Sequence, residues 1–321
     1  MQQNVRQWLS PPDPWKNHNI ARESRHAGTG AWLIQGDAYA DWKSCPSSLL
    51  WVHGERQYLV PDSPYSFLKL MNTTFKAGAG KSVIWCDSLS MVRIRELMPV
   101  LLASSAIIED IRALQKSGLA SLAFFYFDFR EDQKKDLRGL VSSLLVQLCD
   151  QSDAYATILS KFYAAHGRGS QHASDGELMS CLKDILKLQG QARIYTIIDA
   201  LDECSITTGL PSPRDKVLGL IKELVNLEIP NLRICVTSRP EADILSVLEP
   251  LAFRSVSLHG ENGQAEDIAE YVRSVVHTNR EMRRWKTTDK QLVIGELIKK
   301  ANGMYVAYTT ILIPSSCGSV M

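Results

Sequence analysis

The stretch Ile194–Glu203, which reads IYTIIDALDE, decides the fold of this protein. Its first half is a nearly continuous apolar run of strand length that ends at Asp199. Continuous hydrophobicity, without alternating polar residues, is what a strand buried on both faces requires. We therefore predict a central strand whose carboxyl end presents Asp199, with Asp202 and Glu203 following directly.

Further apolar runs of the same kind predict neighbouring strands. They lie at Leu49–His53, Leu122–Phe129, Arg233–Thr237 and Ser255–Leu258. Amphipathic segments separate them, because apolar residues recur at helical spacing between Leu137 and Leu148 and between Val217 and Val225. Strands that alternate with helices form βαβ crossovers. The predicted fold class is therefore α/β, with a mostly parallel sheet flanked by helices and followed by a small helical subdomain.

The rest of the chain predicts smaller parts around this sheet. Residues 1–48 are rich in Pro, Asn, His and Gly and hold four tryptophans, so we expect an irregular lead-in that packs on its neighbours. The α/β domain should span residues 49–260 and the helical subdomain residues 261–303. Residues 304–321 form a tail that departs from the preceding pattern.

Composition and charge exclude several classes of partner. The 321 residues include 36 Lys and Arg against 35 Asp and Glu, so no global positive field favours nucleic acid. The seven cysteines show no C-x-x-C spacing, which argues against a disulfide framework and a zinc site. Residues 1–15 hold no apolar leader, and no apolar run is long enough to span a bilayer. We expect a cytoplasmic protein with neither nucleic-acid nor membrane partners.

A glycine-rich stretch, Lys76–Ser82 (KAGAGKS), matches the end of the phosphate-binding pattern G-x-x-x-x-G-K-[ST]. In that pattern backbone N–H groups surround the phosphates, the lysine reaches the β- and γ-oxygens, and the hydroxyl holds Mg²⁺. The first glycine is missing, since Phe75 stands in its place. Gly54, at the end of the first predicted strand, would complete the pattern if residues 55–75 were absent. The candidate nucleotide-binding residues are Gly54, Gly78, Gly80, Lys81 and Ser82.

The acidic residues of the central strand predict the metal and water chemistry. A hydrophobic strand that ends in an aspartate is the Walker B arrangement, in which Asp199 would hold Mg²⁺ together with Ser82. Asp202 or Glu203 would orient the attacking water. The structural alternative is an acidic turn that caps the next helix.

The next strand ends in VTSRP, residues 236–240, and adds a cationic candidate. A guanidinium at this strand end, that of Arg239, would report on the γ-phosphate. Alternatively Pro240 simply begins a helix, and both roles are compatible.

These motifs, in this order, resemble the NACHT family of signal-transducing (STAND-type) P-loop NTPases, and more closely its fungal members with a nephrocystin-type N-terminal domain. The similarity includes LLWVHG at 49–54, FFYFDFR at 124–130, IIDALDEC at 197–204 and ICVTSRP at 234–240. The resemblance implies a nucleotide-driven switch that uses Mg²⁺ with ATP or GTP. ADP would hold a closed monomer, and the triphosphate would favour homo-oligomers formed through the NTPase domain.

The chain departs from that family in ways that bear on function. Residues 55–75 interrupt the glycine-rich loop, and residues 85–104, which include Pro99, interrupt the helix expected to follow Ser82. We hypothesise that these segments and the tail are translated introns. Two functions follow. One is an NTP-binding switch with slow hydrolysis, in a truncated NLR-like protein. The alternative is a non-catalytic interaction protein whose interrupted loop no longer binds nucleotide.

Overall fold

The computed structural model describes residues 2–24, 30–54, 98–207, 210–258 and 285–301, together with residues 269, 273 and 276–277. The chain divides into two compact units. The first comprises Met1–Gly54 with Val100–Leu258, and the second comprises Glu55–Pro99 with His259–Met321.

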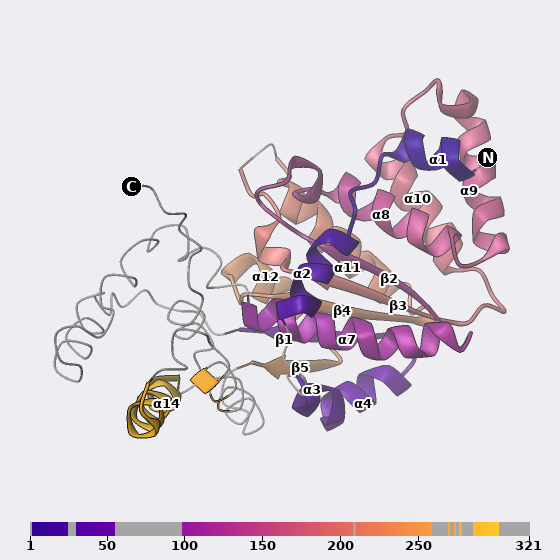
Figure 1. The fold of residues 1–321 in the computed structure, drawn as a ribbon. Coiled ribbons are helices and arrows are strands. Elements are labelled where there is room, and N and C mark those ends of the chain that lie inside the picture. The colour runs from indigo at the N-terminus through magenta and orange to yellow at the C-terminus, as the bar shows by residue number, and fades with distance from the viewer. Residues whose placement is uncertain are drawn as a thin grey trace, which may run out of the picture. The chain divides into compact units, whose positions relative to one another are not determined.

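The first unit is built on a five-stranded parallel sheet in the order β2-β3-β4-β1-β5 (Figure 1). The strands are β1 (Ser48–His53), β2 (Ala120–Tyr126), β3 (Arg193–Asp199), β4 (Leu232–Ser238) and β5 (Arg254–Ser257). The predicted α/β fold class and each of the predicted strands are confirmed. β1 pairs with β4 from Ser48 opposite Arg233 to His53 opposite Ser238. This register places the carboxyl ends of the two strands side by side.

The strands are apolar along their length because both faces of the sheet are covered. Leu49 and Trp51 of β1 contribute to one hydrophobic core, whereas Leu50 and Val52 contribute to the other. Every residue of β2 and β4 is buried. Each residue of these two strands therefore packs against neighbouring elements, so they show no alternation of apolar and polar residues.

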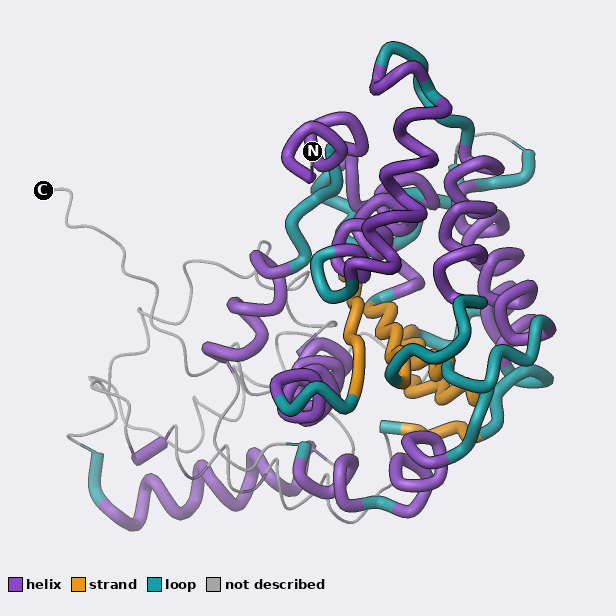
Figure 2. Tube along the Cα trace, turned by 90° about the vertical axis from the view of Figure 1, so that its right-hand side faces the viewer, coloured by secondary structure: helices purple, strands orange, loops and turns teal. Residues whose placement is uncertain are grey.

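Helices form a layer on each side, and Figure 2 shows α7 end-on on one side of the strands. One core includes α8 (Leu137–Cys149), α10 (Asp175–Leu186), α11 (Pro213–Asn226) and α12 (Ala242–Leu248), with α1 (Gln2–Leu9) and α9 (Asp153–Ala165) packed against α8 or one another. The other includes α3 (Ala31–Gln35), α4 (Asp37–Ser44) and α7 (Met98–Lys116). Local signals begin these helices: Ser174 and Ser212 form capping boxes, and Pro213 is the first residue of α11.

The described residues of the lead-in are mostly helical, so the expectation of irregular structure is wrong for that part of it. Residues 2–24 contain α1 and α2 (Trp15–Ser24), and residues 30–44 contain α3 and α4. These helices are short and separated by Pro and Gly residues, which hides their periodicity in the sequence. Helix α4 buries an aromatic side chain against the sheet: Trp42 is fully buried, and its Nε1 donates to the carbonyl of Ile234 at 2.8 Å.

Helix α7 continues without interruption through Ser104 and Ser105. Pro99 therefore causes no break within α7, which begins one residue before it. Pro99 lies in the first turn of α7, where backbone N–H groups have no partner within the helix and proline is tolerated. Residues 85–97 of the proposed insertion lie outside the described residues.

In the second unit the structure describes α14 (Thr287–Ala301), within the predicted helical subdomain. The tail 304–321 lies outside the described residues.

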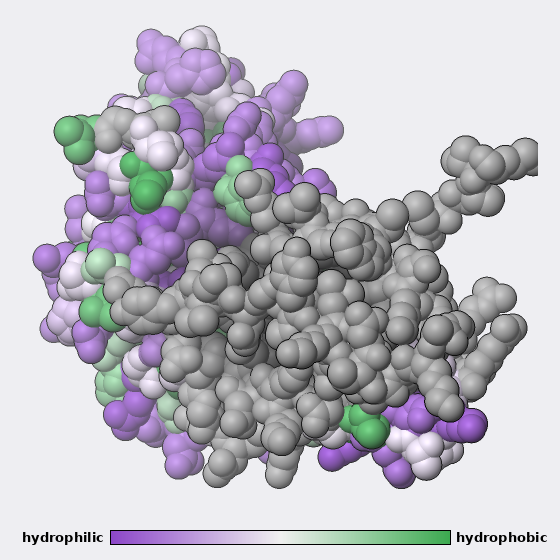
Figure 3. Space-filling model, turned by 90° about the vertical axis from the view of Figure 1, so that its left-hand side faces the viewer, coloured by the Kyte–Doolittle hydropathy of each residue, from purple (hydrophilic) through white to green (hydrophobic). Residues whose placement is uncertain are grey.

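Among the helices described, none combines the length and apolar character needed to cross a bilayer. The described surface in Figure 3 is mostly hydrophilic, with separate hydrophobic spots, and Ile206 and Leu210 are among the exposed apolar side chains.

Candidate functional site

The candidate site lies at the carboxyl ends of β1, β3 and β4. The connection from β1 to β2 includes α7 on one face of the sheet, whereas α11 and α12, which lead into β4 and β5, cover the other face. The next described helices after the neighbouring strands β1 and β4, α7 and α12, thus lie on opposite faces of the sheet. Such a reversal is where open parallel sheets bind ligands, outside the carboxyl ends of the strands.

Asp199, the last residue of β3, is the central carboxylate of the site. Its side chain is buried, and its Oδ1 accepts two hydroxyl hydrogen bonds, from Thr237 Oγ1 at 2.6 Å and from Ser104 Oγ. Thr237 belongs to β4 and Ser104 to α7, so two neighbouring elements fix one carboxylate. Burial raises the pKa of Asp199 to about 6, although both hydrogen bonds oppose this rise.

The chain turns sharply after Asp199. Ala200 adopts a left-handed backbone conformation with φ 53°, and its N–H donates to Thr237 Oγ1 at 3.1 Å. A 3₁₀ turn, η4 (Leu201–Glu203), follows, with the Glu203 N–H bonded to the Ala200 carbonyl at 2.8 Å. Thr237 therefore holds both the carboxylate and the turn that positions the next two acidic residues.

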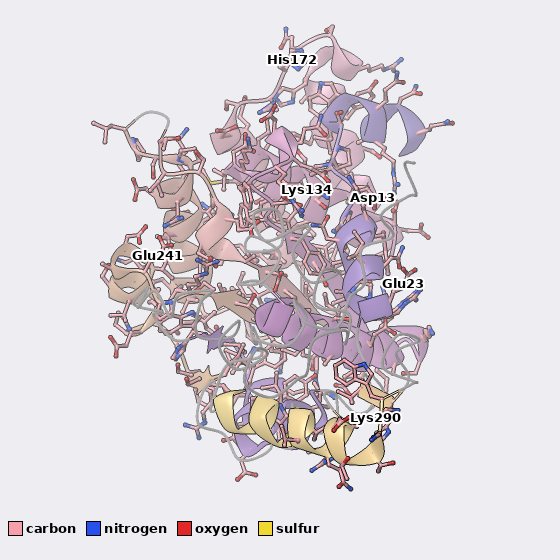
Figure 4. The ribbon with its side chains drawn as sticks, turned by 60° about the vertical axis from the view of Figure 1, so that its left-hand side comes forward. Asp13, Glu23, Lys134, His172, Glu241 and Lys290 are labelled. Atoms are coloured by element: carbon pink, nitrogen blue, oxygen red, sulfur yellow. The ribbon has the colours of Figure 1, made fainter. Side chains whose placement is uncertain are left out.

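Asp202 is paired with Arg239. Its Oδ1 accepts from the Arg239 backbone N–H at 3.0 Å, and its Oδ2 lies 3.4 Å from Arg239 Nε. Burial raises the pKa of Asp202, while the hydrogen bond and charge of Arg239 oppose this rise. The Asp202 carbonyl accepts from the buried Arg214, which also pairs with Glu241, the residue before α12 (Figure 4), at 2.5 Å. Arg214 thus fixes the acidic turn to α11 and α12.

Glu203 lies beside the loop that follows β2. Its Oε2 accepts from the Phe129 backbone N–H at 3.2 Å. Burial raises the pKa of Glu203 to about 8, and the nearby carboxylates of Asp202, Asp128 and Asp199 add to this rise. Glu203 is therefore a carboxyl group that changes protonation near neutral pH.

The structure brings together four of the residues that the sequence singles out: Asp199, Asp202, Glu203 and Arg239. Gly54 lies at the same edge, since its N–H donates to the Ser238 carbonyl at 3.3 Å. The other predicted nucleotide-binding residues, Gly78, Gly80, Lys81 and Ser82, lie outside the described residues. Their approach to Asp199 stays a prediction.

Two residues of the site, Thr237 and Ser104, received no role from the sequence. The sequence could have indicated a role for Thr237, because it ends a strand next to the one that ends at Asp199. Ile198 lies opposite Val236 in these adjacent parallel strands, so the next residues, Asp199 and Thr237, lie at the same edge of the sheet. Ser104 had none, because the helix that carries it was expected to be interrupted there.

The comparisons with known proteins agree with part of the sequence interpretation. A family model described as Nephrocystin 3, N-terminal, matches residues 101–239. The matched segment begins within α7 and ends at Arg239, so it includes Ser104, the acidic turn and Thr237. No curated protein matches the chain. The chain is thus similar to the nephrocystin 3 N-terminal family over this segment, as the resemblance predicts.

Proposed function

We propose, on the premise of this similarity, that the protein is a nucleoside-triphosphate-binding signalling switch with slow Mg²⁺-dependent hydrolysis. One observation carries the proposal. Asp199, the Asp202–Arg239 pair and Glu203 gather at the carboxyl edge of the sheet, next to the end of β1 from which the glycine-rich loop would continue. This is where a parallel sheet binds ligands, and these are the residue types that phosphoryl transfer to water uses.

The residues around Asp199 fit a magnesium ion. The carboxylate and the two hydroxyls are oxygen donors, which are the ligands that Mg²⁺ prefers. A bound ion would neutralise charge on the β- and γ-phosphates. In this proposal Asp199 holds the ion with a serine hydroxyl, assigned to Ser82 by its motif, and Lys81 meets the same phosphates.

The two acidic residues of η4 are suited to different tasks. Both carboxylate oxygens of Asp202 face Arg239, at 3.0 Å from its N–H and 3.4 Å from its Nε. Asp202 therefore serves to hold Arg239. Glu203 has a pKa of about 8, close to the working pH, as general base catalysis requires. We assign the orientation of the attacking water to Glu203, which is mostly protonated at pH 7, in keeping with slow turnover.

Arg239 would link nucleotide state to conformation. Its side chain is 38% exposed and paired with Asp202. A γ-phosphate within reach would compete with Asp202 for the guanidinium, because charge-assisted bonds from arginine to phosphate are strong. Exchange of ADP for ATP or GTP would thereby shift Arg239 between partners and favour the homo-oligomer.

The test is nucleotide binding by the purified full chain, measured with fluorescent ATP, GTP and ADP analogues and Mg²⁺. We expect binding that Lys81→Ala abolishes, while Lys222→Ala, an exposed lysine of α11, leaves it unchanged. A variant lacking residues 55–75 joins Gly54 to Lys76 and restores the uninterrupted motif. If only this variant binds, the proposal is wrong for the full chain, and the non-catalytic alternative holds.

A further inference from the structure

The loop that follows β2, residues 127–135 and here called the β2 loop, is bonded to the acidic turn and to the residue after Cys204. The N–H of Phe129 donates to Glu203 Oε2 at 3.2 Å. The carbonyl of Lys135 accepts from the N–H of Ser205 at 3.0 Å. The position of Glu203, to which the proposed function assigns the attacking water, therefore depends on this loop.

Asp128 fixes the part of the β2 loop that carries the Phe129 N–H. The N–H of Asp128 donates to the carbonyl of Lys134 at 3.1 Å, which closes the loop. Its buried carboxylate accepts from the Arg130 backbone N–H at 2.9 Å and from two nitrogens of the Arg130 guanidinium, each at 2.8 Å. Phe129 lies between these two residues, so a shift of Asp128 would displace the N–H that contacts Glu203.

Asn17 of α2 joins this carboxylate to the lead-in. Its amide nitrogen donates to Asp128 Oδ2 at 3.2 Å, and its amide oxygen accepts from Nζ of Lys134 (Figure 4) at 2.5 Å. The Lys134 side chain is only 1% exposed, and Glu131 also contacts its ammonium, at 3.1 Å. A buried charge needs such polar partners. Asn17 therefore bonds to both residues that close the β2 loop.

The next residue, His18, fixes α2 in place. It is fully buried, and its Nε2 lies 2.8 Å from Glu109 of α7. A second contact between α2 and the loop joins Lys16 to Glu131 at 2.6 Å, but the lysine side chain is 62% exposed. Exposed ion pairs contribute little, so we assign the attachment of the loop to Asn17.

We infer that Asn17 is a positioning residue for Glu203: by holding the β2 loop, it keeps the Phe129 N–H on the carboxylate that orients the attacking water. The inference rests on the proposed function. It extends the hydrolytic site to a lead-in residue 186 positions before Glu203 (203 minus 17). Catalysis by positioning tolerates little displacement, so a small shift of the loop should slow hydrolysis and leave nucleotide binding unaffected.

The experiment compares single-turnover phosphate release from ATP with affinity for a fluorescent ATP analogue, in the full chain with Mg²⁺. Asn17→Ala should reduce phosphate release by about 10- to 100-fold and leave the affinity unchanged. Asn19→Ala makes the same change at an exposed position of the same helix and should alter neither quantity. Asn17→Asp keeps an acceptor for the buried Lys134 but loses the donor to Asp128. It should show the same loss if Asn17→Ala does not fold.

A double-mutant cycle determines whether Asn17 acts through Glu203. In a chain that carries Glu203→Gln, adding Asn17→Ala should cause no further loss of phosphate release, because the group that it positions is already removed. A general structural effect of Asn17 would lower the release by the same factor in both backgrounds. Hydrogen exchange without nucleotide gives a second readout. Peptides covering residues 127–135 should exchange faster in Asn17→Ala than in Asn19→Ala.

Other results would overturn the inference. It fails, while the proposed function stands, if the unsubstituted chain releases phosphate and Asn17→Ala releases it equally fast. It also fails if the losses from Asn17→Ala and Glu203→Gln multiply, or if exchange of residues 127–135 is the same in Asn17→Ala and Asn19→Ala. If the unsubstituted chain binds no nucleotide or releases no phosphate, the inference and the proposed function both fail.

Discussion

Two groups of carboxylates in the sheet-bearing unit lie in opposite electrostatic surroundings. The first group, which meets the lead-in helix α2, consists of Glu109, Asp128 and Glu131. The second group, at the carboxyl ends of β3 and β4, consists of Asp199, Asp202 and Glu203. The pKa values of the first group are lowered and those of the second are raised.

Carboxylates of the first group are paired with donors from α2 or their own loop. The Glu131 carboxylate lies 2.6 Å from Lys16 Nζ, and this hydrogen bond lowers its pKa. Asp128 is buried, but hydrogen bonds from Arg130 and Asn17 outweigh burial and lower its pKa. Such pairs attach the lead-in to the loop after β2, where Lys134 (Figure 4) is also bonded to Asn17 at 2.5 Å.

In the second group hydrogen bonds and charge do not outweigh burial. Burial is the largest influence on the pKa of Asp199, Asp202 and Glu203, and it raises all three. Retaining under-compensated acids at one sheet edge costs stability, and groups perturbed in this way cluster at functional sites. The comparison distinguishes carboxylates whose charge is stabilised by nearby donors from carboxylates whose charged form is disfavoured by burial.

The largest expected effect is on hydrolysis. Glu203→Gln removes the proposed base and should reduce single-turnover phosphate release by about 10²–10⁴-fold, while nucleotide affinity stays unchanged. Glu131→Gln makes the same chemical change in the first group and should leave phosphate release unaffected. Equal loss in both variants, or none in Glu203→Gln, would refute the functional distinction between the groups.

A second prediction concerns stability without metal or nucleotide. Asp199→Asn removes a buried charge but keeps an acceptor for both hydroxyls, so at pH 7.5 the free energy of unfolding should rise by on the order of 1–3 kcal/mol. Asp128→Asn should lower it by about 1–3 kcal/mol, because charged and polar donors lose a buried carboxylate. Urea unfolding measures both.

The stabilising effect of Asp199→Asn should depend on pH, because the pKa of Asp199 is raised. Because the folded-state pKa is about 6, above the ordinary value of 3.8, folding binds a proton as the pH falls. The destabilisation caused by burying the charged Asp199 carboxylate is complete above pH 6 and becomes smaller toward pH 4. The gain from Asp199→Asn should therefore be smaller at pH 5 than at pH 7.5. A variant destabilised at both pH values would contradict the account.

Much of this architecture was predictable because a strand buried on both faces is apolar at nearly every position. The expected strand Ile194–Asp199 forms as Arg193–Asp199. Adjacent strand ends then bring the acidic turn beside Arg239. The expected strand Leu122–Phe129 instead ends at Tyr126, because the following residues enter the loop in which Arg130 bonds Asp128.

The missed parts depend on contacts far apart in the sequence. The helices of the lead-in are only five to ten residues long, too short for a periodic pattern, and tertiary packing decides their structure. Ser104 meets Asp199 across 95 positions, from a helix that begins at Met98 within the segment that the sequence assigned to an insertion. Propensity alone does not reveal either feature.

The smallest expected effect tests the first group through His18. This residue is fully buried, with Nε2 2.8 Å from Glu109 and Nδ1 3.0 Å from the Tyr126 hydroxyl. Burial lowers the pKa of His18, although the Glu109 hydrogen bond opposes this. As the pH falls below the ordinary value of 6.5, the unfolded chain takes up a proton before the folded one, so stability is lost toward acid.

As the pH falls, protonation of His18 lowers the free energy of unfolding whereas protonation of Asp199 raises it. A series of unfolding measurements at different pH values should therefore distinguish the two groups. His18→Gln should flatten the fall in unfolding free energy between pH 7 and pH 5, because it removes the group that takes up a proton on unfolding. In Asp199→Asn the same fall should become steeper, because the opposing gain is removed. If the plots of unfolding free energy against pH were parallel for His18→Gln and the unsubstituted chain, folding would not change the protonation of His18. The electrostatic contrast would then depend only on Asp199, Asp202 and Glu203.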